Sequence, residues 1–313
     1  MLSVIELLGR QARWALPAGV FIGIALPGLA ALMRPLLTAA VIGTLLGALL
    51  RLDWDRFAVL GRRPALPALV VGWLLVASPL LAWQATALLG LGPELRLAVV
   101  LQAAAPPIGS AAVFALILGL DGALAAFCTV IATLLLPLTL TPLMALLLPE
   151  AGVRVDLVPF FLRVSLLGGT PFVLAAIVRR FVGAARLARA DALIGGLNVL
   201  LLVIFAIAVM DGVTARLLAD PQTIAMLLAA ATSAALLLHW AGYLLFRRAG
   251  LVTAYTTSVL SGNRNVGLML VVTAGTAGSL FPLYVGIAQI PMYFAPLLRT
   301  PFLRRSRTRH SPR

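Results

Sequence analysis

Val259-Leu260-Ser261-Gly262-Asn263-Arg264-Asn265-Val266-Gly267-Leu268 places an arginine between two asparagines and two glycines, inside an apolar segment that runs from about residue 251 to 274. A charged side chain at the centre of a bilayer costs roughly 3 kcal/mol on insertion scales, and it persists where it faces the protein interior or a wet cavity. Glycine and asparagine are poor helix formers, so we expect a helix that stops, crosses an irregular turn and starts again. Broken helices of this kind line sites in membrane proteins.

The composition is that of an integral membrane protein. Of the 313 residues, 62% are hydrophobic and 11% are charged, with a mean hydropathy of +1.09, whereas soluble domains are about half apolar and a quarter charged. The formal net charge is +14, but all its lysine and arginine charges are arginines, and apart from Arg264 and Arg163 these fall in loops or at the ends of apolar segments. That distribution follows the positive-inside rule and does not indicate a nucleic-acid partner. Cys128 is the only cysteine, which excludes an intramolecular disulfide.

Ten apolar segments are candidate membrane spans, at about 20 residues per crossing. They lie at about residues 15–33, 34–51, 65–89, 96–119, 122–149, 157–178, 192–210, 221–246, 251–274 and 279–300. The first two could instead form one re-entrant pair. Loops on one side carry most of the arginines, which puts both termini in the cytoplasm of a plasma (bacterial inner) membrane. The sequence therefore predicts an all-α integral membrane protein.

Ten spans divide into two halves of five, and an odd number of spans per half gives the halves opposite orientations. We expect two inverted repeats, at about 14–149 and 157–302, and a basic cytoplasmic tail at 303–313. The whole chain, 1–313, would then form a single transmembrane transporter domain.

A weak internal repeat supports this division. The fifth and tenth predicted spans share a proline spacing, at Pro137 and Pro142 and at Pro291 and Pro296, and each follows an interrupted span. Paired interruptions at corresponding positions of two halves point to a transporter binding site. Chance is the alternative, because prolines are common in membrane helices.

Two regions carry a resemblance to a known family. Ala105-Pro106-Pro107-Ile108-Gly109-Ser110, continued from Asp121 to Pro142, resembles the first crossover helix and the following helix of the bile acid:sodium symporter family and its bacterial relatives. Ser261-Gly262-Asn263-Arg264-Asn265-Val266-Gly267-Leu268 resembles the second crossover. The resemblance implies a ten-helix, inverted-repeat fold in which a core domain with two crossing broken helices moves against a panel domain. It also implies uptake of organic anions coupled to sodium.

The sequence departs from that family at the sodium-binding positions. Where the family's second crossover has a sodium-binding glutamate and then a glutamine, this chain has Leu260 and Arg264. The serine-asparagine pair of the first crossover falls on Ala111 and Ala112. Sodium coordination wants several oxygen ligands and gains from a carboxylate, so Na⁺ is possible as the coupling ion but most of its expected ligands are missing. The candidate ion ligands that remain are Thr129 and Ser261.

Arg264 admits three interpretations. No carboxylate lies deep in any span, so its guanidinium must be satisfied by carbonyl ends of broken helices, by side-chain amides or by an anionic ligand. It could be a tethered cation where related proteins bind sodium, it could clamp a substrate carboxylate or sulfate, or it could brace the crossing. The predicted substrate-binding residues are Arg264, Asn263, Asn265, Ser110 and Gly109, and the predicted crossover breaks are Pro106, Pro107 and Gly262.

The polar neighbours of Arg264 have alternative roles as well. The two asparagines could cap the restarted half-helix, and Ser110 and Gly109 could offer backbone N–H groups to an anion. Thr129 could face the crossing or bond a carbonyl of its own helix. His239 could relay a proton, or it could belong with Trp240 to an interfacial belt.

The leading hypothesis for function is a secondary transporter that moves a small or amphipathic organic anion by alternating access, with doubtful sodium coupling. A sensor or structural membrane protein of the same fold is the main alternative. An intramembrane transferase is less favoured, because such chemistry needs paired carboxylates or a nucleophile with a base, and the spans offer neither. We therefore predict no enzyme, no catalytic residue, no metal site and no nucleic-acid partner; the expected partners are the lipid bilayer and a small organic anion.

Overall fold

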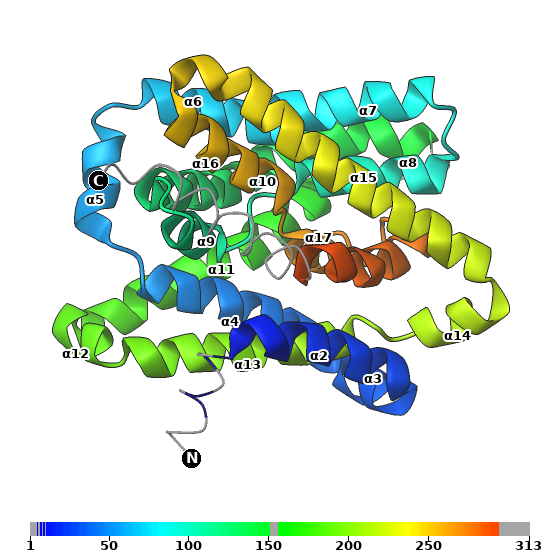
Figure 1. Cartoon of the computed structure of the whole chain (residues 1–313), viewed down its shortest axis with the longest axis horizontal. Coiled ribbons are helices and arrows are strands. Elements are labelled where there is room, and N and C mark those ends of the chain that lie inside the picture. The colour runs from blue at the N-terminus through cyan, green and yellow to red at the C-terminus, as the bar shows by residue number, and fades with distance from the viewer. Residues whose placement is uncertain (1–4, 6, 8, 10, 151–155, 294–313) are drawn as a thin grey trace, which may run out of the picture.

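The computed structural model describes residues 11–150 and 156–293, together with residues 5, 7 and 9, and this part of the chain is all-helical (Figure 1). Helices satisfy every backbone group within one segment, which lipid requires because it offers no hydrogen-bond partners. The predicted all-α class is confirmed. The predicted basic tail and Pro296 lie outside the described residues.

Six helical segments are long and apolar enough to cross a membrane, namely Pro27–Leu50, Ala65–Leu88, Gly122–Leu147, Leu157–Val182, Asp191–Ala219 and Pro221–Ala249. Two shorter apolar helices are Trp14–Ala25 and Leu280–Tyr293. Two further units are broken in the middle: α8 (Pro93–Ala104) with α9 (Ala111–Ile117), and α16 (Leu251–Gly262) with α17 (Val266–Val272). The protein is thus an integral membrane protein, and the ten-span inverted repeat stays a prediction.

The first two predicted spans divide at a different place from the one expected. The helix ends at Ala25, Leu26 has non-helical backbone with φ −122° and ψ 73°, and α3 begins at Pro27. Proline has no N–H and disfavours helical backbone in the residue before it. Arg34, where we expected the division, instead begins a 3-10 turn that carries the helix past Pro35. The expected boundary between residues 33 and 34 is therefore wrong.

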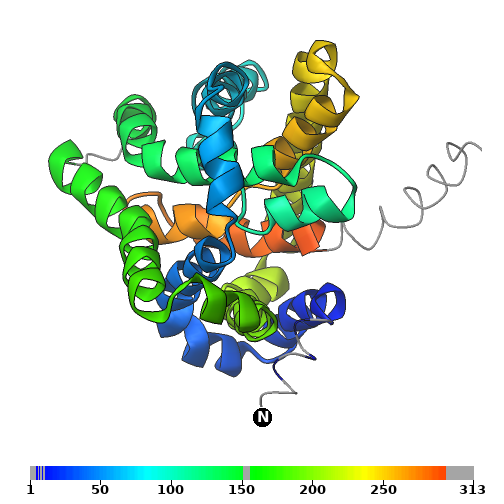
Figure 2. The same ribbon diagram turned by 90° about the vertical axis from the view of Figure 1, so that its left-hand side faces the viewer.

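Two layers of helices face one another (Figures 1 and 2). We call the first layer the panel; its members are α2 (Ala12–Ala25), α3 (Pro27–Met33), α4 (Leu37–Leu50) and α13 (Asp191–Ala208). The second layer, the core group, comprises α6 (Ala65–Gly72), α7 (Ser78–Leu88), α8, α10 (Gly122–Glu150), α15 (Pro221–Phe246) and α16. The other described elements are η1 (Arg34–Leu36), α5 (Trp54–Gly61), η2 (Trp73–Ala77), α11 (Leu157–Val182), α12 (Ala184–Arg189), α14 (Val213–Ala219) and η3 (Arg247–Ala249).

α13 is the axis of the panel, and α2 and α4 approach it through glycines. On α2, Gly19 and Gly23 face α13, and on α4 the corresponding pair is Gly43 and Gly47. Small residues four positions apart let membrane helices pack backbone to backbone, where dispersion contacts are the main source of association. The panel is therefore held by close helix contact along α13.

Two ion pairs fix α4 and the preceding turn against the two ends of α13. The Arg51 Nε lies 2.6 Å from Asp191 Oδ1 at one end, and the Arg34 Nη1 lies 3.0 Å from Asp211 Oδ2 at the other. Exposed pairs contribute at most about 1 kcal/mol each. Their effect is to set the register of the two helices rather than to hold them together.

Gly23→Ala should destabilise the protein by about 1–3 kcal/mol, the usual range for an overpacked contact. A methyl group at this position would lie 2.8 Å from the Ile207 carbonyl oxygen and 2.8 Å from the Met210 Cβ, and the backbone oxygen has no room to yield. Thermal unfolding in detergent measures the loss. Gly28→Ala is the matched control, because nothing lies within 4 Å of a methyl group there; equal unfolding temperatures for the two variants would contradict the close-packing argument.

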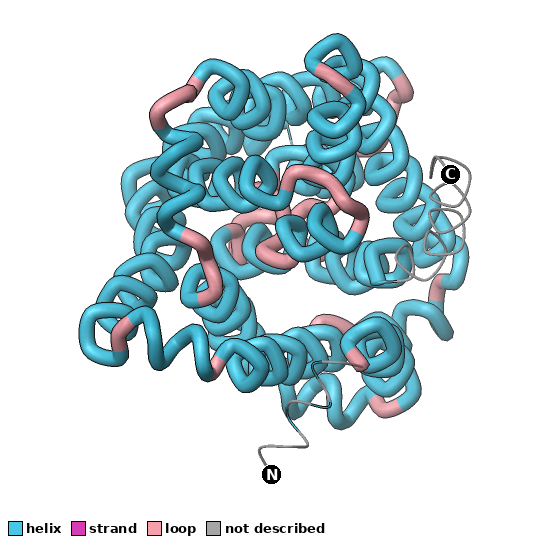
Figure 3. Tube along the Cα trace, turned by 60° about the vertical axis from the view of Figure 1, so that its left-hand side comes forward, coloured by secondary structure: helices cyan, strands magenta, loops and turns pink. Residues whose placement is uncertain are grey.

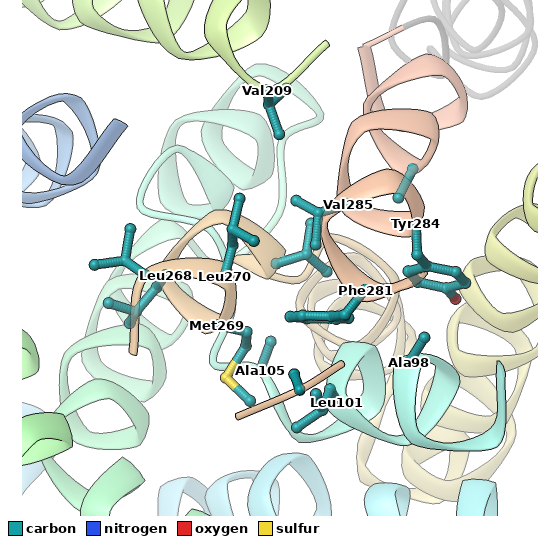
Figure 4. Close-up of a cluster of buried hydrophobic side chains, with 14 of the residues drawn as sticks. Ala98, Leu101, Ala105, Val209, Leu268, Met269, Leu270, Phe281, Tyr284 and Val285 are labelled. Atoms are coloured by element: carbon teal, nitrogen blue, oxygen red, sulfur yellow. The ribbon is translucent and has the colours of Figure 1, made fainter. Parts of the chain in front are cut away.

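An apolar cluster lies beside the two breaks, where α8, α17 and the helix Leu280–Tyr293 meet (Figure 4). Leu101, Leu268 and Phe281 are members, each at most 1% exposed. The Tyr284 hydroxyl donates to the Gln102 Oε1 within this cluster. The packing holds both broken units in one body.

Candidate functional site

The two breaks meet at the centre of the molecule, where irregular segments from distant parts of the chain lie side by side (Figure 3). Pro107 and Arg264 form an isolated antiparallel bridge. The Ile108 N–H donates to the Asn263 carbonyl at 2.9 Å, and the Asn265 N–H donates to the Pro106 carbonyl at 2.7 Å. The predicted contact between the breaks is thus present in the structure.

Both breaks are short. Irregular backbone covers residues 105–110 and 263–265, whereas Ala111, Gly262 and Val266 are already helical. Asn265 explains the sharp restart, because its Oδ1 accepts from the Leu268 N–H at 3.0 Å and so caps α17. The predicted capping role of Asn265 is confirmed, and Gly262 is the last residue of α16 instead of part of the turn.

Arg264 is fully enclosed, with no exposed surface. Its Nε donates to the Ser261 carbonyl at 2.7 Å, and its Nη1 donates to the Leu74 and Ala105 carbonyls at 2.9 and 2.8 Å. Its Nη2 donates to the Ser78 Oγ at 2.8 Å. Leu74 and Ser78 belong to the continuous helical segment Ala65–Leu88, which we call the third helical unit. The guanidinium therefore joins both broken units to this third helical unit.

The position of these carbonyls matches what a cation needs. Ala105 caps the end of α8 and Ser261 stands in the last turn of α16. A helix C-terminus carries a partial negative charge, so two such ends converge on one positive group. In this conformation the guanidinium donates to protein oxygens, and Arg264 also contributes to the lining of a cavity of about 30 Å³. The bracing interpretation is thus supported directly, and the substrate clamp stays a prediction.

Sequence reasoning missed the partners that the third helical unit supplies. The segment Trp73–Ala77 is a π-helical turn, and such a turn changes the normal carbonyl pattern inside a helix. Leu74 within it gives its carbonyl to Arg264, while the Trp73 Nε1 donates to the Ser261 Oγ at 2.8 Å. Ser78 follows this turn directly. The sequence did offer one indication of these partners, because Trp73 and Ser78 place two polar groups five residues apart in an apolar span.

A cavity of about 1340 Å³ lies between the panel and the core group. At one end its lining includes the exposed ion pairs Arg51–Asp191 and Arg56–Asp53. Elsewhere the lining is mostly apolar, with a few polar groups near the breaks. The polar lining near the breaks includes Ser110, Thr129, Asn198 and Asn263, and Ala126 lines the cavity on α10.

All five predicted substrate-binding residues lie along this cavity or along a small neighbouring one, whose lining includes Arg264. Gly109, Ser110 and Asn263 line it directly. Asn265 lines a small neighbouring cavity of about 30 Å³, together with Gly109, Ser110 and the panel residue Asn198. The Asn198 Oδ1 is buried and has no hydrogen-bond partner within the described chain. Asn198 is thus a polar residue of the panel that lines both cavities, with its Oδ1 against Gly47 of α4.

The two candidate sodium ligands have their hydroxyl groups engaged. The Thr129 Oγ1 donates to the Ala125 carbonyl of its own helix at 2.8 Å. The Ser261 Oγ donates to the Thr257 carbonyl at 2.7 Å and accepts from the Trp73 Nε1, while the Ser261 carbonyl binds Arg264. Leu260 is fully buried among apolar side chains. The surroundings of the second break are therefore arranged around the guanidinium.

His239 does not face outward as a residue of an interfacial belt would. Its ring lies against Gly262, so closely that a methyl group on Gly262 would overlap it. Trp240, the next residue, is 63% exposed and shows the outward direction of the helix. The imidazole therefore belongs to the surroundings of the second break.

Comparison with known proteins gives a family match. The Sodium Bile acid symporter family matches residues 38–217, which is more than half of the chain and includes the first break. No curated protein matches the chain. Members of this family are transporters, so a transport function and contact with the bilayer follow at this level. The chain belongs to the sodium bile acid symporter family.

Proposed function

We propose that the protein is a secondary transporter that moves a small or amphipathic organic anion across the membrane by alternating access. The observation that carries this proposal is the cavity of about 1340 Å³ between the panel and the core group, with the two breaks at its wall. A mostly apolar cavity with a few polar groups fits an amphipathic ligand. The anionic character follows the family's name, because bile acids are carboxylic acids.

Alternating access needs one body to move against another. The core group is tied together by the Arg264 hydrogen bonds and by the bridge between the breaks. The panel is tied together by the glycine contacts along α13. The ends that carry Arg51 and Arg56 belong to the side that the positive-inside rule places in the cytoplasm, so the cavity in this conformation would open inward, with both termini on the same side.

The hydrogen bonds of Arg264 support transport that is independent of sodium. Unwound carbonyls and half-helix C-termini coordinate cations in transporters built on broken helices. Here the same kind of oxygen cluster holds the guanidinium at 2.7 to 2.9 Å. A permanent cation at this place makes sodium unnecessary for holding the breaks together, so transport would not depend on sodium.

The test is thermal stability of the detergent-solubilised protein in sodium, potassium or choline salts, each with and without a panel of carboxylated and sulfated amphiphiles. A ligand that binds the native state stabilises it by RT ln(1 + [L]/Kd), about 2.7 kcal/mol at a hundredfold excess over Kd. We expect a rise with at least one amphiphile, of the same size in all three cations.

Ala126→Trp shows whether the ligand sits in the cavity. Ala126 lines the cavity on α10, so an indole there should occupy ligand volume and remove the stabilisation. Ala229→Trp on α15 is the matched control, because Ala229 is exposed on another helix and does not line the cavity. Equal stabilisation of both variants would place the ligand elsewhere, and flux of the ligand into proteoliposomes would then separate transport from mere binding.

A further inference from the structure

His239 lies where α15 meets the second break, half-buried against Gly262. Its Nδ1 is 2.7 Å from the Ala235 carbonyl oxygen. Because a carbonyl only accepts, Nδ1 carries the hydrogen, and in the neutral ring Nε2 is then the acceptor. Nε2 is 3.5 Å from the Nδ2 of Asn263.

Asn263 connects this imidazole to both breaks and to the cavity. Its Nδ2 donates to the Val259 carbonyl at 2.8 Å, and its own backbone carbonyl accepts from the Ile108 N–H at 2.9 Å. It also lines the large cavity. Any change in its side chain therefore reaches the contact between the breaks and the cavity wall.

We propose that His239 is a proton-binding site whose occupancy rearranges the second break through Asn263. A proton on Nε2 turns this atom into a donor, which then faces the donor Nδ2 of Asn263. The contact becomes repulsive until the amide turns its Oδ1 toward the imidazolium. Turning the amide breaks its hydrogen bond to the Val259 carbonyl, and so changes the side chain that lines the cavity.

The charged groups on the elements around His239 are mostly cationic, so a bound proton adds to the positive charge near the second break. α15 packs against α16, α14, α8 and η3. Arg264 directly follows α16 in the chain. The acidic residue carried by these elements is Glu94, in the first turn of α8. It lies eleven residues before the break at Ala105, which is about 16 Å along a helix. A proton on His239 thus adds a second positive charge beside the break that encloses Arg264. The other charged or titratable groups carried by these elements are Arg96, Arg216, Arg247, Arg248, Tyr243 and Tyr255.

A proton bound here would bias the wall of the cavity and would therefore be a coupling ion for transport. That consequence rests on the proposed function, whereas the proton site itself does not. Imidazole is the side chain whose charge changes between about pH 5 and 8, which suits a site that must load and release a proton under physiological gradients.

The experiment is NMR of protein labelled with ¹⁵N at histidine and at asparagine side chains. The chain contains two histidines and three asparagines, so His310→Gln leaves His239 as a single signal pair, and single substitutions assign the amides. At high pH we expect the neutral tautomer with the hydrogen on Nδ1 and none on Nε2. Between about pH 5 and 8 we expect conversion to imidazolium, with the Asn263 amide signal moving at the same midpoint and the Asn198 amide unmoved.

Two variants make the coupling specific. Asn263→Ala should shift the titration midpoint of His239, whereas Asn198→Ala, on the opposite wall of the cavity, should leave it unchanged. A neutral His239 down to about pH 5, or a titration that leaves the Asn263 amide unmoved, would overturn the inference whatever a transport assay shows. A titrating His239 in a protein that moves no amphiphile would support the proton site while contradicting the proposed function.

Discussion

Arg264→Met should lower the free energy of unfolding by about 3–5 kcal/mol, the range seen when one member of a buried charged network is removed. Methionine fills much of the same volume but leaves the carbonyl oxygens of Ala105 and Ser261 without the guanidinium donor, whereas the Leu74 carbonyl keeps its hydrogen bond from the Ser78 Oγ. Each unsatisfied buried acceptor costs about 1–3 kcal/mol. Thermal unfolding in detergent should show the largest drop of any single substitution at the breaks.

Arg163→Met is the matched control for this loss. Arg163 also donates to backbone carbonyls, at 3.1 Å to Val271 in the last turn of α17 and at 2.6 Å to Ala274 just beyond that helix. Its side chain, however, is only partly buried. Water can replace its hydrogen bonds, so we expect a loss of about 1 kcal/mol. An Arg264→Met protein as stable as the Arg163→Met protein would show that the guanidinium does not hold the breaks together.

The breaks were predictable because their causes are local. Pro106 and Pro107 remove two adjacent backbone donors, and Asn263, Arg264 and Asn265 form a cluster of weak helix formers in an apolar segment. The ends of the breaks were less predictable, because they depend on whether a side chain finds a capping partner. Asn265 finds the Leu268 N–H, and the helix therefore restarts one residue after it.

The surroundings of Arg264 could not be predicted in the same way. Its partners Leu74 and Ser78 lie 190 and 186 residues away in the sequence. The Leu74 carbonyl becomes available in a π-helical turn, and no residue pattern in Trp73–Ala77 announces such a turn. The sequence showed that the charge needs oxygen partners, and only the fold shows that these partners are protein carbonyls.

The panel gives a similar contrast. Glycines four residues apart in α2 and α4 are visible in the sequence, but their common partner α13 lies about half the chain away and is identified by the fold. Leu26 and Arg34 both precede a proline, yet the helix stops just before Leu26 and continues through Arg34. Identical local signals thus gave different outcomes, because a 3-10 turn accommodates the second proline.

Leu260→Glu combined with Arg264→Gln should make the stability of the protein depend on sodium. Removing the guanidinium leaves a cluster of carbonyl oxygens at the ends of α8 and α16, and glutamate at position 260 adds the carboxylate that a hard cation favours. The family resemblance assigns these same two residue types to the sodium-binding crossover. Sodium at ten times its Kd should then stabilise the double variant by about 1.4 kcal/mol.

The comparison that decides this point is Leu260→Gln with Arg264→Gln. This variant has nearly the same volume and hydrogen-bonding groups but no negative charge, so sodium should stabilise it much less than it stabilises the glutamate variant. The unaltered protein should show equal unfolding temperatures in sodium, potassium and choline, because Arg264 already fills the oxygen cluster. If the glutamate variant is also indifferent to sodium, the carbonyls around Arg264 do not form a cation site. Arg264 would then act only as a brace between the two broken helices and the third helical unit.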